Sequence, residues 1–237
     1  MSGQSVLTVR RRSLVGVPLV VGGLALVAGL TIVPRGLLVH LIRNLDQRGG
    51  LASRRGTRAY ASAAWLFAGL HRRVVSDAAA ATGDGEATIL DVGSGPGDVL
   101  VDLAARLPRC TVVGVEPSVE MRRSASQRGV RSVDGRAEAI PLPDRSADLI
   151  VSSLSAHHWD DPAAAFQEMA RVLRPGGQAR LYDVRFAGYG PDEARRFAIA
   201  AGLPSTAVAH VILDERLFGL RAYSLITLRP DAQESRR

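Results

Sequence analysis

The pattern of apolar and polar residues changes along the chain. Residues 14–33 (LVGVPLVVGGLALVAGLTIV) contain no charged residue and almost nothing polar. From about residue 59 onward, short apolar runs alternate with longer stretches in which apolar residues recur at helical spacing. An uninterrupted apolar run is typical of a membrane span, whereas the alternation is typical of an α/β domain.

The alternating part predicts a sheet with helices packed on its faces. We expect strands at residues 88–92, 111–115, 130–133, 147–152, 178–184, 208–213 and 223–228. We expect helices at residues 60–75, 99–106, 118–127, 162–173 and 193–201, with a Gly/Asp turn at residues 82–85. Strand–helix alternation with short connections predicts a Rossmann-like, doubly wound, mostly parallel seven-stranded sheet. Because no helix separates the last two strands, one strand should be antiparallel.

The apolar run predicts a transmembrane helix at residues 14–34. Twenty helical residues at about 1.5 Å each reach across the hydrocarbon layer. A basic tail (residues 1–13) precedes the span and a basic juxtamembrane linker (residues 35–58) follows it. Two alternatives remain: a buried core helix, and an export signal, because Arg11 and Arg12 precede the run.

Charge is unevenly distributed between the two parts. The formal net charge is +7, and every basic residue other than histidine is arginine. Residues 1–73 hold 11 Arg and one acid, Asp46, for a charge of +10, which leaves −3 for residues 74–237. A basic arm beside an apolar run favours an anionic membrane surface, and the near-neutral body argues against nucleic acid as a partner. The larger positive charge after the span predicts a single-pass protein of the cell membrane with a cytoplasmic domain.

The segment ILDVGSGPG (residues 89–97) carries the main chemical signal. A predicted strand enters a turn of alternating glycines, which lets the backbone approach a ligand closely. Glu116 ends the second predicted strand, where a carboxylate can accept both hydroxyls of a ribose. The dinucleotide fingerprint requires glycine where this chain has Asp98, so the fit to NAD is imperfect.

Four segments together resemble one enzyme family. They are ILDVGSGPG, VVGVEPS, GRAEAIPLPDRSADLIVSSLSAHHWDDP and ARVLRPGG, in that order between residues 89 and 177. The chain resembles the class I S-adenosylmethionine-dependent methyltransferases, in particular the small-molecule subfamily of the ubiquinone and menaquinone methyltransferases. The resemblance implies S-adenosyl-L-methionine as cofactor and a methyltransferase domain over residues 59–229, followed by a disordered tail at 230–237.

The resemblance also implies a role for individual residues. Asp91 and the glycine loop would hold the methionine end of the cofactor, Glu116 the ribose, and Pro117 and Met121 the adenine. Arg136 stands where the family usually has Asp, so stacking on the adenine ring is the alternative role for its side chain, while the Ala137 N–H meets the ring. The implied cofactor-binding residues are Asp91, Gly93, Ser94, Gly95, Gly97, Glu116, Pro117, Met121, Arg136, Ala137, Ser153 and Leu154.

Two adjacent histidines follow the fourth predicted strand. His158, or else His157, could take a proton from a phenol or enol acceptor, although a structural role for the pair stays open. We favour His158, because continued strand geometry would turn His157 the other way. Asp160 and Asp161 fit a helix N-cap better than catalytic acids, and no metal site is expected.

The sequence therefore predicts methyl transfer to a small acceptor, apolar or membrane-resident, at carbon or oxygen. Two alternatives remain: an NAD(P)-dependent oxidoreductase, and a catalytically inactive, membrane-anchored module that binds the cofactor. Asp98 and the stretch after residue 134 argue against the first, whereas Arg136 favours the second.

Overall fold

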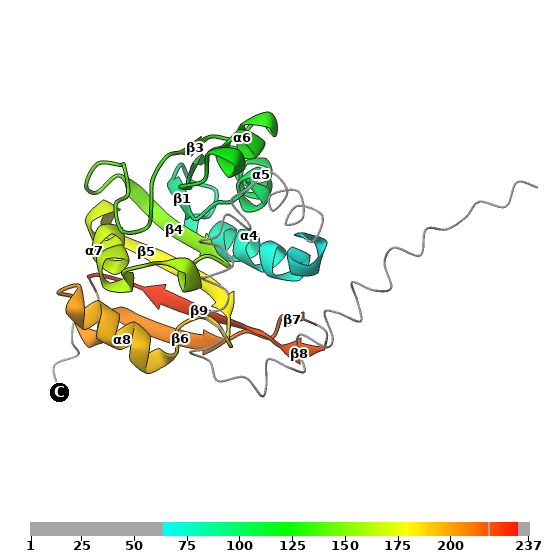
Figure 1. The fold of residues 1–237 in the computed structure, drawn as a ribbon. Helices are drawn as coiled ribbons and strands as arrows, with labels where there is room; N and C mark the ends of the chain where they lie inside the picture. The colour runs from blue at the N-terminus through cyan, green and yellow to red at the C-terminus, as the bar shows by residue number, and fades with distance from the viewer. Residues whose placement is uncertain (1–63, 218, 232–237) are drawn as a thin grey trace, which may run out of the picture. The chain divides into compact units, whose positions relative to one another are not determined.

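The computed structural model describes residues 64–217 and 219–231 (Figure 1). The predicted tail, span and linker at residues 1–58 lie outside the described residues, as does most of the predicted tail at 230–237. Within the described part, no helix combines the length and the apolar character needed to cross a membrane.

A seven-stranded sheet forms the centre of the domain, with strand order β3-β2-β1-β4-β5-β9-β6. The strands are β1 (Thr88–Val92), β2 (Thr111–Val115), β3 (Ser132–Val133), β4 (Ala147–Ser153), β5 (Leu173–Val184), β6 (Val208–Ile212) and β9 (Tyr223–Leu228). β9 is antiparallel to both of its neighbours, β5 and β6, whereas the pairs from β3 to β5 are parallel. The predicted sheet is confirmed, including its antiparallel strand.

Helices cover both faces of this sheet (Figure 1). α4 (Ala68–Thr82) and α5 (Asp98–Arg106) pack in one hydrophobic cluster with Ile89, Leu149 and Tyr182. α7 (Pro162–Val172) and α8 (Pro191–Ala200) pack in the other, with Leu90 and Ile150. Consecutive strand residues thus point to opposite faces and are buried on both, which explains the continuous apolar runs in the sequence. α6 (Val119–Gln127) contacts β3.

Several element boundaries differ from the prediction. A 3-10 helix, Ala64–Phe67, leads into α4, which continues to Thr82, seven residues past the predicted end. The alanines at 78–81 favour helix, and the helix ends at Gly83, whose φ is +60°. The predicted first helix also began at residue 60, outside the described residues.

Other differences from the prediction concern β3, the segment between β6 and β9, the start of α8 and the start of β5. β3 is only two residues long instead of four, and a small hairpin, β7 (Arg216–Leu217) with β8 (Leu220–Arg221), joins β6 to β9. α8 begins at Pro191, where the Glu193 carboxylate accepts the Gly190 N–H at 2.9 Å. β5 begins at Leu173, and its register with β4 shifts before Gln178, so the Pro-Gly-Gly segment is accommodated within the strand.

Candidate functional site

A pocket of about 330 Å³ opens at the carboxyl ends of β1, β2 and β4. Parallel strands of a doubly wound sheet all end at the same edge, which is where such folds bind ligands. Segments from four parts of the chain line it: the loop after β1, the end of β2 with α6, the loop after β3, and the end of β4. The lining residues are Gly93, Gly95, Pro96, Val115, Glu116, Pro117, Ser118, Met121, Gly135, Arg136, Ala137, Glu138, Ser153, Leu154, Ser155, His158 and Trp159.

The glycine loop reaches this position because its backbone turns sharply. Gly93, Gly95 and Gly97 all have positive φ, at 76°, 54° and 88°. A Cβ on Gly93 would lie 1.9 Å from Ser155 Oγ, so only glycine allows the loop to approach the end of β4.

Every N–H in this loop already has an acceptor within the protein. Gly93 and Ser94 donate to the Val115 carbonyl at 2.7 and 3.3 Å, and Gly97 donates to the Ser94 carbonyl at 3.1 Å. Gly95 donates to Glu116 Oε2 at 3.0 Å, and residue 96 is proline, which has no N–H. The loop N–H groups are therefore used to build the pocket.

The floor of the pocket is acidic. Glu116 is 8% exposed, and its other oxygen accepts the Ser118 N–H at 2.8 Å. Asp91 lies behind it on β1 and is 2% exposed. Burial, together with the nearby charge of Glu116, raises the pKa of Asp91 to about 7. A cationic group bound near Asp91 would therefore favour the ionised form of its carboxyl group.

The end of β4 forms the opposite wall. Ser153 is buried, and its hydroxyl has no hydrogen-bond partner among the described residues. Leu154 has a φ of +57°, a conformation that costs a non-glycine residue of the order of 1–3 kcal/mol and often marks a functional site. A 3-10 turn, η2 (Ala156–His158), follows. His158 and Trp159 complete the wall, and Trp159 Nε1 donates to Ser155 Oγ at 3.3 Å.

His157 is held away from the pocket by a residue that sequence analysis did not select. Its Nδ1 lies 2.8 Å from Asp183 Oδ1, and its backbone N–H donates to Asp183 Oδ2 at 3.0 Å. Asp183 is 4% exposed and lies near the end of β5. Its position near the carboxyl end of a buried strand, at the edge where parallel sheets bind ligands, was the available signal.

Arg136 is engaged by two carboxylates at the rim of the pocket. It pairs with Asp160, and its Nε lies 3.6 Å from Glu138 Oε2. Glu138 also accepts the N–H groups of Asp160 and Asp161, at 2.8 and 3.3 Å. These contacts join the loop after β3 to the segment after η2. The predicted cap is confirmed, because Asp161 accepts the N–H groups of residues 163 and 164 at the start of α7.

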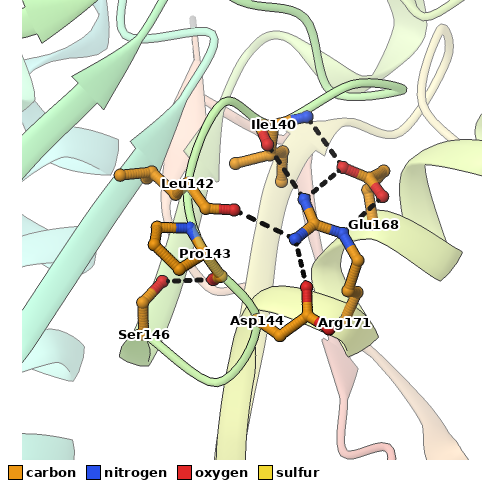
Figure 2. Close-up of polar contacts among 7 residues, drawn as sticks. All are labelled: Ile140, Leu142, Pro143, Asp144, Ser146, Glu168 and Arg171. Atoms are coloured by element: carbon orange, nitrogen blue, oxygen red, sulfur yellow. Dashed lines mark hydrogen bonds and ion pairs between the residues drawn. The ribbon is translucent and has the colours of Figure 1, made fainter.

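Arg171 of α7 holds the loop after β3 by hydrogen bonds (Figure 2). Its guanidinium donates to both oxygens of Glu168, to Asp144, and to the carbonyls of Ile140 and Leu142, at 2.6–3.0 Å. The hydrogen bonds to Glu168 and Asp144 raise the pKa of Arg171, and those from Arg171 lower the pKa of Glu168. The loop from Gly135 to Asp144 is thereby fixed relative to the sheet.

Comparisons with known proteins agree on one family. A family described as "Methyltransferase domain" matches residues 90–181. A demethylmenaquinone methyltransferase from Roseiflexus castenholzii is 42% identical over 100 residues, 40% of this chain and 42% of that protein. An uncharacterized methyltransferase from Mycobacterium sp. (strain JLS) is 42% identical over 119 residues, 49% of this chain and 46% of its own length. The chain thus matches less than half the length of these curated relatives.

A solved structure shares the fold. It is a crystal structure described as a putative S-adenosyl-L-methionine-dependent methyltransferase from Methanococcus maripaludis, with a TM-score of 0.64 and 21% identity. The alignment covers 78% of this chain and 96% of that one. The segment that matches the methyltransferase domain family, residues 90–181, contains all the residues that line the pocket. The cofactor of this family is S-adenosylmethionine.

Most of the residues predicted to bind the cofactor lie together in the pocket. Those that line the pocket are Gly93, Gly95, Glu116, Pro117, Met121, Arg136, Ala137, Ser153 and Leu154, and His158 joins them. Asp91, Ser94, Gly97 and His157 lie outside the lining. Ser94 is buried, and its Oγ lies 3.0 Å from Ser132 Oγ. Gly97, at the start of α5, packs against Ala125. Their part is to shape the loop.

Among the residues that the structure describes, no group of three or more His, Cys, Asp or Glu side chains could hold a metal ion.

Proposed function

We propose that this chain transfers a methyl group from S-adenosylmethionine to a small acceptor, at carbon or oxygen. The observation that carries the proposal is the electrostatics of the pocket. An NAD(P) pyrophosphate would need free loop N–H groups to bind it. Here those N–H groups are used internally, and two carboxyl groups form or underlie the floor.

The same electrostatics fit S-adenosylmethionine. The cofactor carries positive charge on its sulfonium and its amino group, which would favour the ionised form of the buried Asp91 carboxyl group. The two oxygens of Glu116 accept the N–H groups of Gly95 and Ser118, which orients the carboxylate at the end of β2, where it can accept a ribose hydroxyl. Asp91 does not line the pocket, so it acts on the cofactor through the charge of its carboxyl group. The hydroxyl of Ser153 is available for a ligand on the opposite wall.

When bound, the cofactor supplies an electrophilic methyl group, and the protein has to align the acceptor with it. His158 is the pocket-lining residue suited to accept a proton from an oxygen or acidic carbon acceptor. Trp159 provides an apolar wall beside it. The pocket volume of about 330 Å³ lies within the range of small-molecule sites.

The acceptor that we propose is apolar or membrane-resident. The apolar run at residues 14–33 and the arginines on both sides of it support attachment to the cell membrane by a single span, with the domain in the cytoplasm. A demethylmenaquinone methyltransferase among the relatives is consistent with a quinone-like acceptor. Deleting residues 1–45 should move the protein from the membrane fraction to the soluble fraction. A truncated protein that stays with the membrane would contradict this anchor.

Calorimetry on the full-length protein tests the function. We expect micromolar affinity for S-adenosylmethionine and for its demethylated product, and weak binding of NAD. The reverse preference would support the oxidoreductase alternative. Methyl-labelled cofactor should then label a component of a lipid extract, detected by mass spectrometry. Tight cofactor binding without label in any extract would identify an inactive binding module.

A further inference from the structure

Asp183 is a buried carboxylate with three hydrogen-bond contacts. Its Oδ2 accepts the His157 backbone N–H at 3.0 Å. Its Oδ1 accepts the Val184 N–H at 2.8 Å and lies 2.8 Å from His157 Nδ1. An ionised carboxylate only accepts hydrogen bonds, so this contact places a proton on Nδ1 of His157.

Strand order brings these residues together. β4 and β5 are parallel neighbours, and Ser153 pairs with Tyr182 at their carboxyl ends. Asp183 is therefore next to the turn η2 that leaves β4, although 26 residues separate it from His157 in the chain. Gly188 packs closely against Asp183, because a Cβ added to Gly188 would lie 2.9 Å from the Cβ of Asp183.

The turn η2 is held at two successive residues. The Tyr189 hydroxyl donates to the Ala156 carbonyl at 2.6 Å, and Asp183 binds both N–H groups of His157. The third residue of the turn, His158, lines the pocket. Its ring lies against that of His157, with centroids 4.0 Å apart and planes tilted by 42°. A fixed His157 ring thus restricts where the His158 ring can go.

We propose that Asp183 is a positioning residue that acts through His157 to hold His158 toward the acceptor. This role rests on the proposed methyl transfer, in which His158 accepts the proton. Asp183 itself does not reach the pocket. Its effect on the reaction is transmitted through the two hydrogen bonds to His157 and the contact between the two rings.

Asp183→Asn tests this role with the least change in shape. An amide keeps one acceptor oxygen and replaces the other with an NH₂ group, which cannot accept a hydrogen bond. Either the backbone N–H or the ring N–H of His157 then loses its partner. Asp192→Asn is the matched control, because the Asp192 side chain is 80% exposed on α8.

The first measurement follows the ring protons directly. The full-length protein, labelled with ¹⁵N in its five histidines, gives few enough ring signals to assign with single His→Gln variants. We expect the Nδ1–H form of His157 in the wild type and in Asp192→Asn, and its loss or partial loss in Asp183→Asn. An unchanged His157 signal in Asp183→Asn, or an Nε2–H form in the wild type, would overturn the assignment.

The second measurement is kinetic. Asp183→Asn should lower the rate at saturating acceptor by roughly 10–100-fold, as is usual for residues that orient an essential imidazole. Cofactor affinity should not change. In the His158→Ala background the same substitution should have almost no further effect, because the two act as one unit. If the two substitutions instead lower the rate by independent factors that multiply in the double variant, Asp183 has a purely structural role.

Two outcomes remain separable. If the protein methylates no acceptor, the proposed function fails, and the His157 signals still decide whether Asp183 holds that ring. If Asp183→Asn does not fold, His157→Gln replaces it. Glutamine can still donate to Asp183 but has no ring beside His158, so the rate should fall by a similar factor. A wild-type rate in His157→Gln would refute the transmission through the ring.

Discussion

Replacing Asp91 by asparagine should change how the stability of the protein depends on pH. Asp91 is 2% exposed, and burial and the charge of Glu116 raise its pKa from an ordinary 3.8 to about 7. The folded protein therefore holds a proton that the unfolded chain releases. The contribution of Asp91 to wild-type stability should be full below about pH 4 and should be lost as the pH rises through about 7.

The size of this effect follows from the shift. Each pKa unit corresponds to about 1.4 kcal/mol, so a shift of roughly three units costs the wild type up to about 4 kcal/mol above pH 7. Asparagine has nearly the same shape and does not titrate. Asp91→Asn should thus gain stability relative to the wild type as the pH rises from about 4 to 8, and gain little at pH 4.

Urea denaturation of both proteins at several pH values measures this difference. The buried Trp159 offers a fluorescence signal, and other titrating groups cancel when the two proteins are compared at the same pH. Asp84→Asn, in an exposed turn, serves as control and should give a difference that does not depend on pH. A pH-independent difference for Asp91→Asn as well would show that Asp91 is ionised normally, and the electrostatic argument for a cationic ligand would fail.

Three other substitutions test separate parts of the site. Glu116→Ala should weaken cofactor binding by about 1.5–3 kcal/mol in calorimetry, and an unchanged affinity would refute its ribose role. His158→Ala should lower the rate at saturating acceptor by roughly 10²–10⁴-fold without changing cofactor affinity. It should also remove a limb of the pH–rate profile that rises between about pH 5 and 8, whereas a retained limb would return the histidine to a structural role. Arg171→Met should lower the free energy of unfolding by about 1–3 kcal/mol in urea denaturation, against little change for the exposed Arg195→Met.

Local sequence was enough to predict elements whose limits coincide with a change in residue type. β1, β2 and β9 match the prediction to the residue, because each is an apolar run with polar or turn-forming residues at both ends. The predicted end of α4 was wrong: the alanines at 78–81 favour helix, but they show no alternation of polar and apolar residues that would reveal a buried helix face. Packing decides it, since Val74 and Ala78 are fully buried against the sheet.

The glycine loop and Glu116 were also accessible from sequence, because both follow directly from where a strand ends. Their charge state was not. The shift at Asp91 requires the burial of its carboxyl group and its nearness to Glu116, and the pairing of β1 with β2 establishes that nearness. Sequence could place the two carboxylates at the same edge of a sheet but could not say that water would be excluded from one of them.

Asp183 illustrates the limit of local inference most clearly. A lone aspartate at the end of a strand has the same appearance in sequence whether it is solvated, binds a ligand or orients a neighbour. What distinguishes these cases is the strand beside it: β5 follows β4 in the sheet, so the residue at its end faces the turn that carries His157. A contact between residues 26 positions apart depends on that order and on the tight turn at Ala156–His158. In a strand-like extension, alternation alone would direct the histidines to opposite sides. The turn instead buries one against Asp183 and leaves the other in the pocket, so the division of roles between the histidines depends on the carboxylate as much as on the histidines themselves.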